Sequence, residues 1–254
     1  MRRLRALRQF QKCLGMYQGL KWYATSFLDS RGLTSGTVRM RPSMLAHPVE
    51  LRLGSSDPNV FSGILVSNAY GFVHTLGGDI KTILDLGANI GLSSAFFLSR
   101  WPGAKLIAVE PDPENYALLR KNLSPYSAQC IQGAAWSRHT SLALSPTQGE
   151  RQEWARIVLE GVGEVRAYTM QDLVLALGTV DFLKINIEGA EKAIFNGDTS
   201  WLGHVRNLAI ELHDEECARA FRKGMNGYRW EESTYGGFVV CRSIVPRGPA
   251  AESK

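Results

Sequence analysis

The hydrophobic pattern beyond residue 80 alternates short apolar runs with amphipathic segments. Five apolar runs have the length of buried strands, and they cover residues 81–87, 105–111, 128–137, 181–189 and 205–214. Amphipathic segments with helical spacing follow the first two runs, at residues 92–101 and 113–123. Strands that alternate with helices are typical of βαβ units, so the pattern predicts an α/β, doubly wound, mostly parallel sheet.

Two more strand-like runs, 228–233 and 237–243, are separated by a few residues that include Gly236. Because so short a connection has no room for a crossover helix, we expect an antiparallel hairpin at one edge of a seven-stranded, Rossmann-like sheet. Residues 141–170 are expected to form a small additional β excursion rather than a helix. Residues 245–254 are predicted to be a disordered tail.

The chain ahead of the sheet predicts an N-terminal helical and β cap. Apolar residues alternate from Val49 to Leu53, and after a turn the pattern continues as a short helix that we expect to lie over the entrance of the domain. Further upstream, one amphipathic helix is predicted from apolar positions that recur every three or four residues, namely Leu4, Leu7, Phe10, Leu14 and Tyr17. We therefore divide the chain into residues 1–46 (basic helix and cap), 47–244 (main domain) and 245–254 (tail).

Composition limits the classes of protein to which this pattern can belong. A chain of 254 residues that is 44% hydrophobic is long enough for one α/β core with an appendage. No apolar run approaches the roughly 20 residues that a membrane-spanning helix needs. The four cysteines are far apart and form no C-x-x-C pair, which favours free thiols, a cytoplasmic protein and no structural zinc.

The positive charge is concentrated at the N-terminus. Residues 1–31 contain seven Lys and Arg residues against one Asp, a net charge of +6, and the remainder has 22 basic and 23 acidic residues. The favoured interpretation is a helix that packs on the domain or on a second subunit. A homodimer is therefore one of the possible assemblies. A peripheral membrane contact through this helix is the minority interpretation. A nucleic-acid partner is disfavoured because the main domain has no obvious basic stripe.

The segment "ILDLGANIGLSS" is the strongest local signal for a ligand site. A strand ends at Asp85, and a glycine-rich turn with Gly87 and Gly91 opens a helix whose free amide groups can face a ligand. The G-x-x-x-G spacing differs from the pyrophosphate-binding G-x-G-x-x-G, and the turn has no phosphate-loop lysine. An adenosine ligand without phosphates fits better. Glu110 ends the next strand, 19 residues after Gly91, where a carboxylate can accept hydrogen bonds from ribose hydroxyls.

Taken together, these segments resemble the FkbM-type family of class I S-adenosylmethionine-dependent methyltransferases. The resemblance spans roughly residues 47–214 and rests on "HPVELRLGSSDPNVFSGILV", "DLGANIGLSS", "VEPDPENYALLRKNL", and "TMQDLV" followed by "VDFLKINIEGAE". It implies that residues 47–244 are a class I methyltransferase domain with S-adenosyl-L-methionine as cofactor. The implied reaction is O-methylation of a hydroxyl on a small-molecule or sugar acceptor.

The resemblance also implies which residues hold the cofactor. The methionine end would be held by Asp85, Gly87, Asn89 and Gly91, and the ribose by Glu110. Near the adenine would lie Asp112, Ala134 and Ala135, and Ala88 and Pro111 are further cofactor-binding candidates. For Ala134 and Ala135, plain strand packing is an equally good interpretation. Tyr70 is expected to close over the cofactor, since aromatic residues ahead of the first strand often do so.

The segment "KINIEGAE" departs from the family pattern K-I-D-x-E-G-x-E, because Asn186 stands where aspartate is expected. The two-residue period of a strand places Asn186 and Glu188 on the same side, at the strand's carboxyl end. An alcohol becomes a good nucleophile when a base takes its proton, an effect of about 10²–10⁴-fold. Since an amide is not a base, Asn186 is expected to position the acceptor, and Glu188 or His213 to take the proton.

Several alternatives stay open at this point. Lys184 can be a paired structural lysine inside its strand. A magnesium ion on Glu188, the Asn186 carbonyl and Asp214 is conceivable, but the spacing has no metal signature, and we assign no metal site. Methylation of RNA or another polymer is an alternative activity suggested by the basic N-terminus. A non-catalytic cofactor-binding scaffold is a third alternative, suggested by Asn186.

Overall fold

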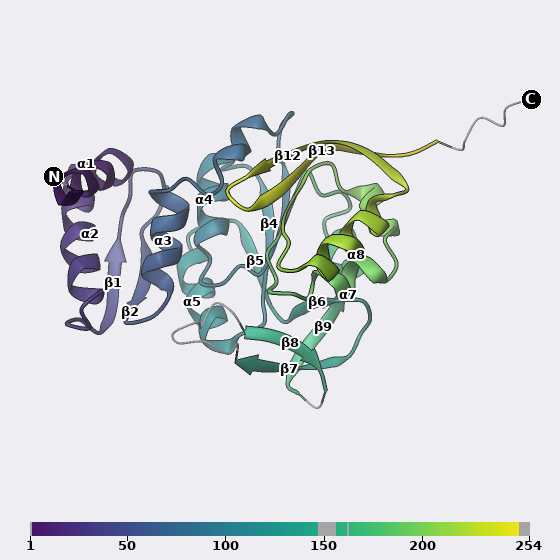
Figure 1. The fold of residues 1–254 in the computed structure, drawn as a ribbon, viewed down its shortest axis with the longest axis horizontal. Helices are drawn as coiled ribbons and strands as arrows, with labels where there is room; N and C mark the ends of the chain where they lie inside the picture. Colours follow the sequence, from purple (N-terminus) through teal and green to yellow (C-terminus); the bar gives the residue numbers. More distant parts are fainter. Residues whose placement is uncertain (1, 147–155, 162, 249–254) are drawn as a thin grey trace, which may run out of the picture.

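A seven-stranded sheet forms the centre of the computed structural model, which describes residues 2–146, 156–161 and 163–248 (Figure 1). From edge to edge its strands are β12 (Tyr228–Tyr235), β13 (Phe238–Pro246), β11 (Leu208–Glu211), β10 (Phe182–Ile185), β3 (Thr82–Leu86), β4 (Lys105–Glu110) and β5 (Ala128–Gln132). The strands from β11 to β5 are parallel, whereas β13 is antiparallel to both β11 and β12. The predicted doubly wound sheet with a terminal antiparallel hairpin is confirmed.

Both faces of the sheet are buried, which explains why its parallel strands read as nearly continuous apolar runs. Along β3, Ile83 belongs to the core on one face and Leu84 to the core on the other. The first face is covered by α3 (Asp57–Leu65), the 3-10 helix η1 (Gly71–Thr75), α4 (Leu92–Arg100) and α5 (Pro113–Leu123). The second face is covered by α6 (Met170–Leu175), α7 (Glu191–Asn196), the 3-10 helix η2 (Ser200–His204) and α8 (Glu215–Met225).

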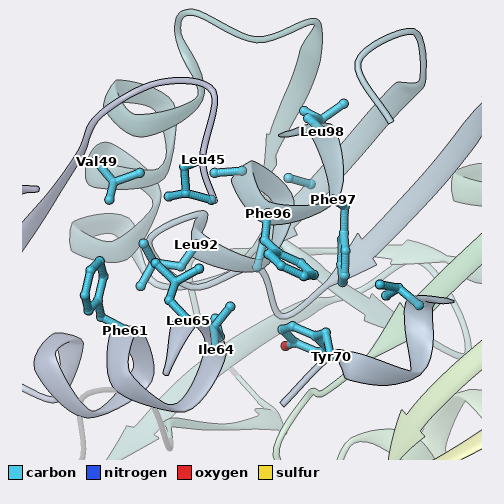
Figure 2. Close-up of a cluster of buried hydrophobic side chains, with 14 of the residues drawn as sticks. Leu45, Val49, Phe61, Ile64, Leu65, Tyr70, Leu92, Phe96, Phe97 and Leu98 are labelled. Carbon is cyan, nitrogen blue, oxygen red and sulfur yellow. The ribbon is translucent and has the colours of Figure 1, made fainter. Parts of the chain in front are cut away.

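The cap consists of α3 and a two-stranded antiparallel sheet of β1 (Gly36–Met40) and β2 (Val49–Leu53). The predicted strand and helix are confirmed, while β1 was not predicted. Apolar side chains join the cap to the sheet domain, as Figure 2 shows for Phe61, Ile64 and Leu65 beside Leu92 and Phe96 of α4. The Asn122 side chain of α5 also exchanges hydrogen bonds with the Glu50 backbone of β2 (2.7 and 3.0 Å), which fixes the cap against the domain.

The predicted amphipathic helix at the N-terminus is present but shorter than its apolar spacing indicated, because Tyr17 belongs to a second helix. Two helices, α1 (Arg2–Leu14) and α2 (Met16–Asp29), meet at Gly15, whose φ of 85° interrupts the helix. They cross closely, because a Cβ atom at Gly19 would lie 2.5 Å from the Gln11 Cα. Trp22 packs on the Phe61 ring at 4.4 Å, so the pair rests on the cap as expected. Among the described residues, the structure contains no helix with the length and apolar character needed to cross a membrane.

The prediction of one strand over residues 128–137 is wrong. The chain leaves the main sheet at Gly133, and β6 (Ala134–Trp136) joins a second sheet in the order β6-β9-β7-β8. A Cβ atom at Gly133 would lie 2.6 Å from the Arg166 carbonyl oxygen, so only glycine fits where the two sheets meet. The predicted β excursion is confirmed in β7 (Ser141–Pro146), β8 (Arg156–Glu160) and β9 (Val165–Thr169).

The predicted tail overlaps the end of the sheet. Strand β13 continues through Val245 and Pro246, where Pro246 pairs with Tyr228 of β12. The last part of the predicted tail, residues 249–254, lies outside the described residues. The assignment of a disordered tail therefore stays a prediction for those six positions.

Candidate functional site

A pocket opens at the carboxyl ends of β3, β4 and β10, beneath α3. It contains about 930 Å³ of open space including its mouth. Its predicted wall residues are Tyr70, Gly87, Ala88, Asn89, Glu110, Pro111, Asp112, Ala134, Ala135, Asn186 and Glu188. Wall residues that we had not predicted for the site include Val60, Ile64, Ser93 and Asn115. Asp85, Gly91 and His213 lie behind this wall.

Asp85 is fully buried and holds the glycine-rich turn from below. Its Oδ1 lies 3.1 Å from Lys184 Nζ, and its Oδ2 accepts hydrogen bonds from the hydroxyls of Ser93 (2.6 Å) and Ser94 (2.7 Å). Lys184 Nζ also donates to backbone carbonyl oxygens of the turn, including that of Gly87 at 2.7 Å. Because Lys184, Ser93 and Ser94 bind the two carboxylate oxygens of Asp85, we infer that Asp85 fixes the conformation of the glycine-rich turn. A direct contact with a ligand stays a prediction.

The turn itself brings two strand ends into close contact. Gly87 has a φ of 71°, and a Cβ atom there would lie 1.8 Å from the carbonyl oxygen of Asn186. Gly91, with a φ of 86°, is the N-cap of α4. Asn89 also has a positive φ, 51°, a conformation that asparagine tolerates better than most residues. Gly87 and Gly91 are therefore needed for the backbone conformation of the turn, while Ala88 and Asn89 line the pocket.

Glu110 lies at the floor of the pocket and is 5% exposed. Its Oε2 accepts a hydrogen bond from the Asn89 amide (2.8 Å), and its Oε1 accepts one from the Asp112 amide (3.0 Å). Burial raises the pKa of Glu110 to about 7, since it outweighs these backbone hydrogen bonds, which lower it. Asp112 has a structural task as well, because its Oδ1 caps α5 by accepting from the amides of Glu114 and Asn115.

Tyr70 lines the pocket but is packed into the aromatic core. Its ring lies 5.0 Å from that of Phe97 and 5.4 Å from that of Phe238 (Figure 2 shows Tyr70 beside Phe97). Burial, followed by the charges of Asp85 and Glu211, holds the pKa of Tyr70 well above its usual range. The hydroxyl is therefore neutral near physiological pH. Closure of Tyr70 over a cofactor stays a prediction.

The wall beside the glycine-rich turn follows β10. This strand ends at Ile185, so Asn186 and Glu188 lie in the following turn, and the two-residue period of a strand does not apply to them. Both still line the pocket, with Glu188 at a φ of 53°. The backbone amide of Asn186 donates a hydrogen bond to the Leu86 carbonyl oxygen at 3.2 Å. Its side-chain Oδ1 is buried and has no hydrogen-bond partner among the described residues.

Behind Glu188, an imidazole lies between two carboxylates. His213, two residues beyond β11, places Nε2 3.3 Å from Glu188 Oε2 and Nδ1 2.9 Å from Glu191 Oε1. Burial alone would lower the pKa of His213, but the hydrogen bonds to Glu188 and Glu191 raise it from 6.5 to about 10. Near neutral pH this histidine is therefore a cation that cannot accept another proton.

Glu191 is the functional neighbour that sequence reasoning missed. Its side chain is fully buried, and it also accepts hydrogen bonds from the Ile187 amide (3.2 Å) and the Cys217 thiol (3.3 Å). These contacts hold Glu191 against His213, and His213 in turn contacts Glu188. The only signal in the sequence was a second acid three positions after Glu188.

The magnesium hypothesis gains no support from the arrangement of side chains. In the part of the chain that the structure describes, no three His, Cys, Asp or Glu residues are grouped to hold one metal ion. Asp214, one of the proposed ligands, caps α8 by accepting a hydrogen bond from the Cys217 amide at 2.6 Å. The role of a metal in the reaction stays untested.

Comparisons with known proteins agree with the fold and the pocket. The family model described as "Methyltransferase FkbM domain" matches residues 85–225. A crystal structure of a methyltransferase FkbM from Methylobacillus flagellatus KT covers 94% of this chain and 59% of its own, with a TM-score of 0.50 and 15% identity. At that identity the likeness shows the fold alone.

Two curated relatives carry methyltransferase names. The 2-O-methyltransferase NoeI of Sinorhizobium fredii is 27% identical over 157 residues, which cover 53% of this chain and 64% of NoeI. Methyltransferase sdnD of Sordaria araneosa is 48% identical over 176 residues, which cover 54% of this chain and 68% of sdnD. This chain thus spans less than two thirds of NoeI, and a further curated relative is matched over only 9% of its length.

Proposed function

Because this chain belongs to the FkbM methyltransferase family, whose members use S-adenosylmethionine, we propose that it methylates a hydroxyl group of a small molecule or sugar. The observation that carries the proposal is the single pocket in which Glu110 and the glycine-rich turn face Asn186 and Glu188. One side has the groups expected for an adenosine ligand, and the other has a carboxylate and an unpartnered amide oxygen for a polar acceptor. The name of NoeI adds support for an oxygen acceptor.

The residues of the pocket fit the cofactor. Each carboxylate oxygen of Glu110 accepts one backbone hydrogen bond, and the Asn115 side chain also donates to this carboxylate. Since a carboxylate can accept about four hydrogen bonds, about one position is left for a ribose hydroxyl. Ala134 and Ala135 offer small apolar surfaces for an adenine ring, and Ala88 and Asn89 line the turn where the methionine end would be held. When bound, S-adenosylmethionine supplies a methyl group on a positively charged sulfur, which an acceptor oxygen can attack.

Glu188 is our candidate for the base. Its carboxylate lines the pocket and can accept the proton that the acceptor hydroxyl loses as it is methylated. His213 is protonated below about pH 10 and is therefore not suited to be the base at neutral pH. Its positive charge instead orients Glu188 from behind, and Glu191 holds His213 in place. The side-chain amide of Asn186 can form a hydrogen bond with the acceptor hydroxyl and direct the hydroxyl oxygen towards the methyl group.

The proposal is tested in two steps with the full chain. Isothermal titration should detect binding of S-adenosylmethionine. Transfer of an isotope-labelled methyl group should then appear on at least one member of a panel of glycosides and hydroxylated natural products. No cofactor binding at high micromolar concentration would contradict the proposal. Transfer to RNA or protein but to no small hydroxyl compound would assign the chain to a polymer methyltransferase instead.

Cofactor affinity should depend on pH through Glu110. With its pKa raised to about 7, the carboxyl is charged at pH 8 and mostly neutral at pH 6. Since a neutral carboxyl has fewer lone pairs for the ribose hydroxyls, we expect affinity to weaken by up to about tenfold as pH falls from 8 to 6. Titration calorimetry at both pH values measures the effect. Glu110→Gln should bind weakly at both, and an unchanged pH dependence in that variant would exclude Glu110 as its origin.

A further inference from the structure

The outer face of α2 exposes a stripe of apolar side chains. Met16 is 79% exposed, Tyr17 74%, Leu20 54% and Leu28 38%. At about 100° per residue these positions fall within roughly a third of the helix circumference. The opposite side of the helix buries Trp22 against the cap. Figure 1 places α2 at the end of the molecule away from the sheet domain, so the stripe faces outwards.

The N-terminal segment that carries this stripe is basic. The segment 1–31 has a net charge of +6, and its only acid, Asp29, accepts a hydrogen bond from the Gly54 amide (2.6 Å). Arg8 and Lys12 of α1 are exposed, and Lys21 borders the stripe on α2. The rest of the chain has a net charge of −1, so the excess of basic over acidic residues lies in this N-terminal segment.

We propose that α1 and α2, together termed the N-terminal hairpin, dock on an anionic lipid surface. Exposed aliphatic side chains beside clustered Lys and Arg residues suit the boundary between headgroups and acyl chains. A nucleic acid would match the charge but would leave Met16, Leu20 and Leu28 without apolar partners. A second copy packed on this face by a twofold axis would bring a segment of charge +6 against its equal, which is repulsive.

Vesicle sedimentation of the full chain tests this inference. We expect binding to vesicles of phosphatidylcholine with about a third phosphatidylserine, little binding to phosphatidylcholine alone, and a loss of binding as salt rises. The double variants Met16→Ser/Leu20→Ser and Arg8→Glu/Lys12→Glu should each lower partitioning by about tenfold or more. Retained binding of S-adenosylmethionine checks that the variants are folded.

A matched control distinguishes the effect of where the charges are changed from the effect of the change in net charge. Arg222→Glu/Lys223→Glu makes the same change in charge on exposed residues of α8 and should leave partitioning nearly unchanged. Equal losses in the two charge variants would overturn the proposal, as would absence of binding to the anionic vesicles. Dimerisation in analytical ultracentrifugation that Met16→Ser/Leu20→Ser abolishes, without vesicle binding, would assign the stripe to a second copy and overturn it as well.

Discussion

Replacement of Glu188 by glutamine should lower the rate of methyl transfer by about 10²–10⁴-fold and leave cofactor affinity unchanged. Glutamine keeps the size of the side chain but cannot accept the proton of the acceptor hydroxyl. Glu188 lines the pocket on the side opposite Glu110, so the change leaves the proposed ribose contact intact. Single-turnover transfer at saturating S-adenosylmethionine measures the rate, and calorimetry measures the affinity.

Glu211→Gln is the control for this experiment. It makes the same chemical change at the end of β11, close to His213, but Glu211 is not among the residues that line the pocket. We expect Glu211→Gln to lower the rate of methyl transfer much less than Glu188→Gln does. A normal rate in Glu188→Gln would show that Glu188 is not the base. A loss confined to cofactor affinity would place Glu188 in the cofactor site instead.

Lys184→Met should destabilise the fold by about 3–5 kcal/mol, the cost of leaving one charge of a buried pair uncompensated. Lys184 and Asp85 are 2% and 0% exposed, so no water replaces the lost partner of the Asp85 carboxylate. The carbonyl oxygens of Leu86 and Gly87 would also lose the hydrogen bond from Lys184, although the backbone amide of Asn186 still donates to Leu86. Urea unfolding followed by fluorescence measures the free energy of unfolding.

The exposed pair of Lys81 and Asp79 offers a matched control. Their charged atoms lie 3.4 Å apart, and both side chains are more than 70% exposed. Lys81→Met should therefore cost less than about 1 kcal/mol. If Lys184→Met were no more destabilising than this control, the buried pair would not support the turn. Partial recovery of stability in the double variant Asp85→Asn/Lys184→Met would show that the cost comes from the unpaired charge.

The sheet was predictable because its central strands β3, β4 and β10 are buried on both faces and therefore appear in the sequence as apolar runs. The errors occurred at glycines. The apolar spacing of the N-terminal helix continues across Gly15, and only the backbone angle reveals the break. The run 128–137 continues across Gly133, and only the closeness of Arg166 shows why the chain must leave the sheet there. Strand β1 was missed because most of it is exposed and gives no strong pattern.

The site was predictable where its residues are close in sequence. The glycine-rich turn and Glu110 form a local signature, and most of the residues it implied line the pocket. The pairing of charges was not predictable, because Asp85 and Lys184 are far apart in the chain and meet only through the register of β3 and β10. The same limit applies to His213. Its place between Glu188 and Glu191, which removes it as a neutral base, depends on two segments that are more than 20 residues apart in the chain.

The contact between Gly87 and the carbonyl oxygen of Asn186 restricts how this enzyme can acquire new acceptors. Because a Cβ atom at residue 87 would lie 1.8 Å from that oxygen, the loops that carry the two sides of the pocket interlock through their backbones. A change that shifts the backbone at residue 186 would also distort the cofactor loop. Acceptor range can diversify more freely at Val60 of α3, which lines the pocket from the cap and is only partly buried. Directed evolution towards new substrates should therefore begin with this position.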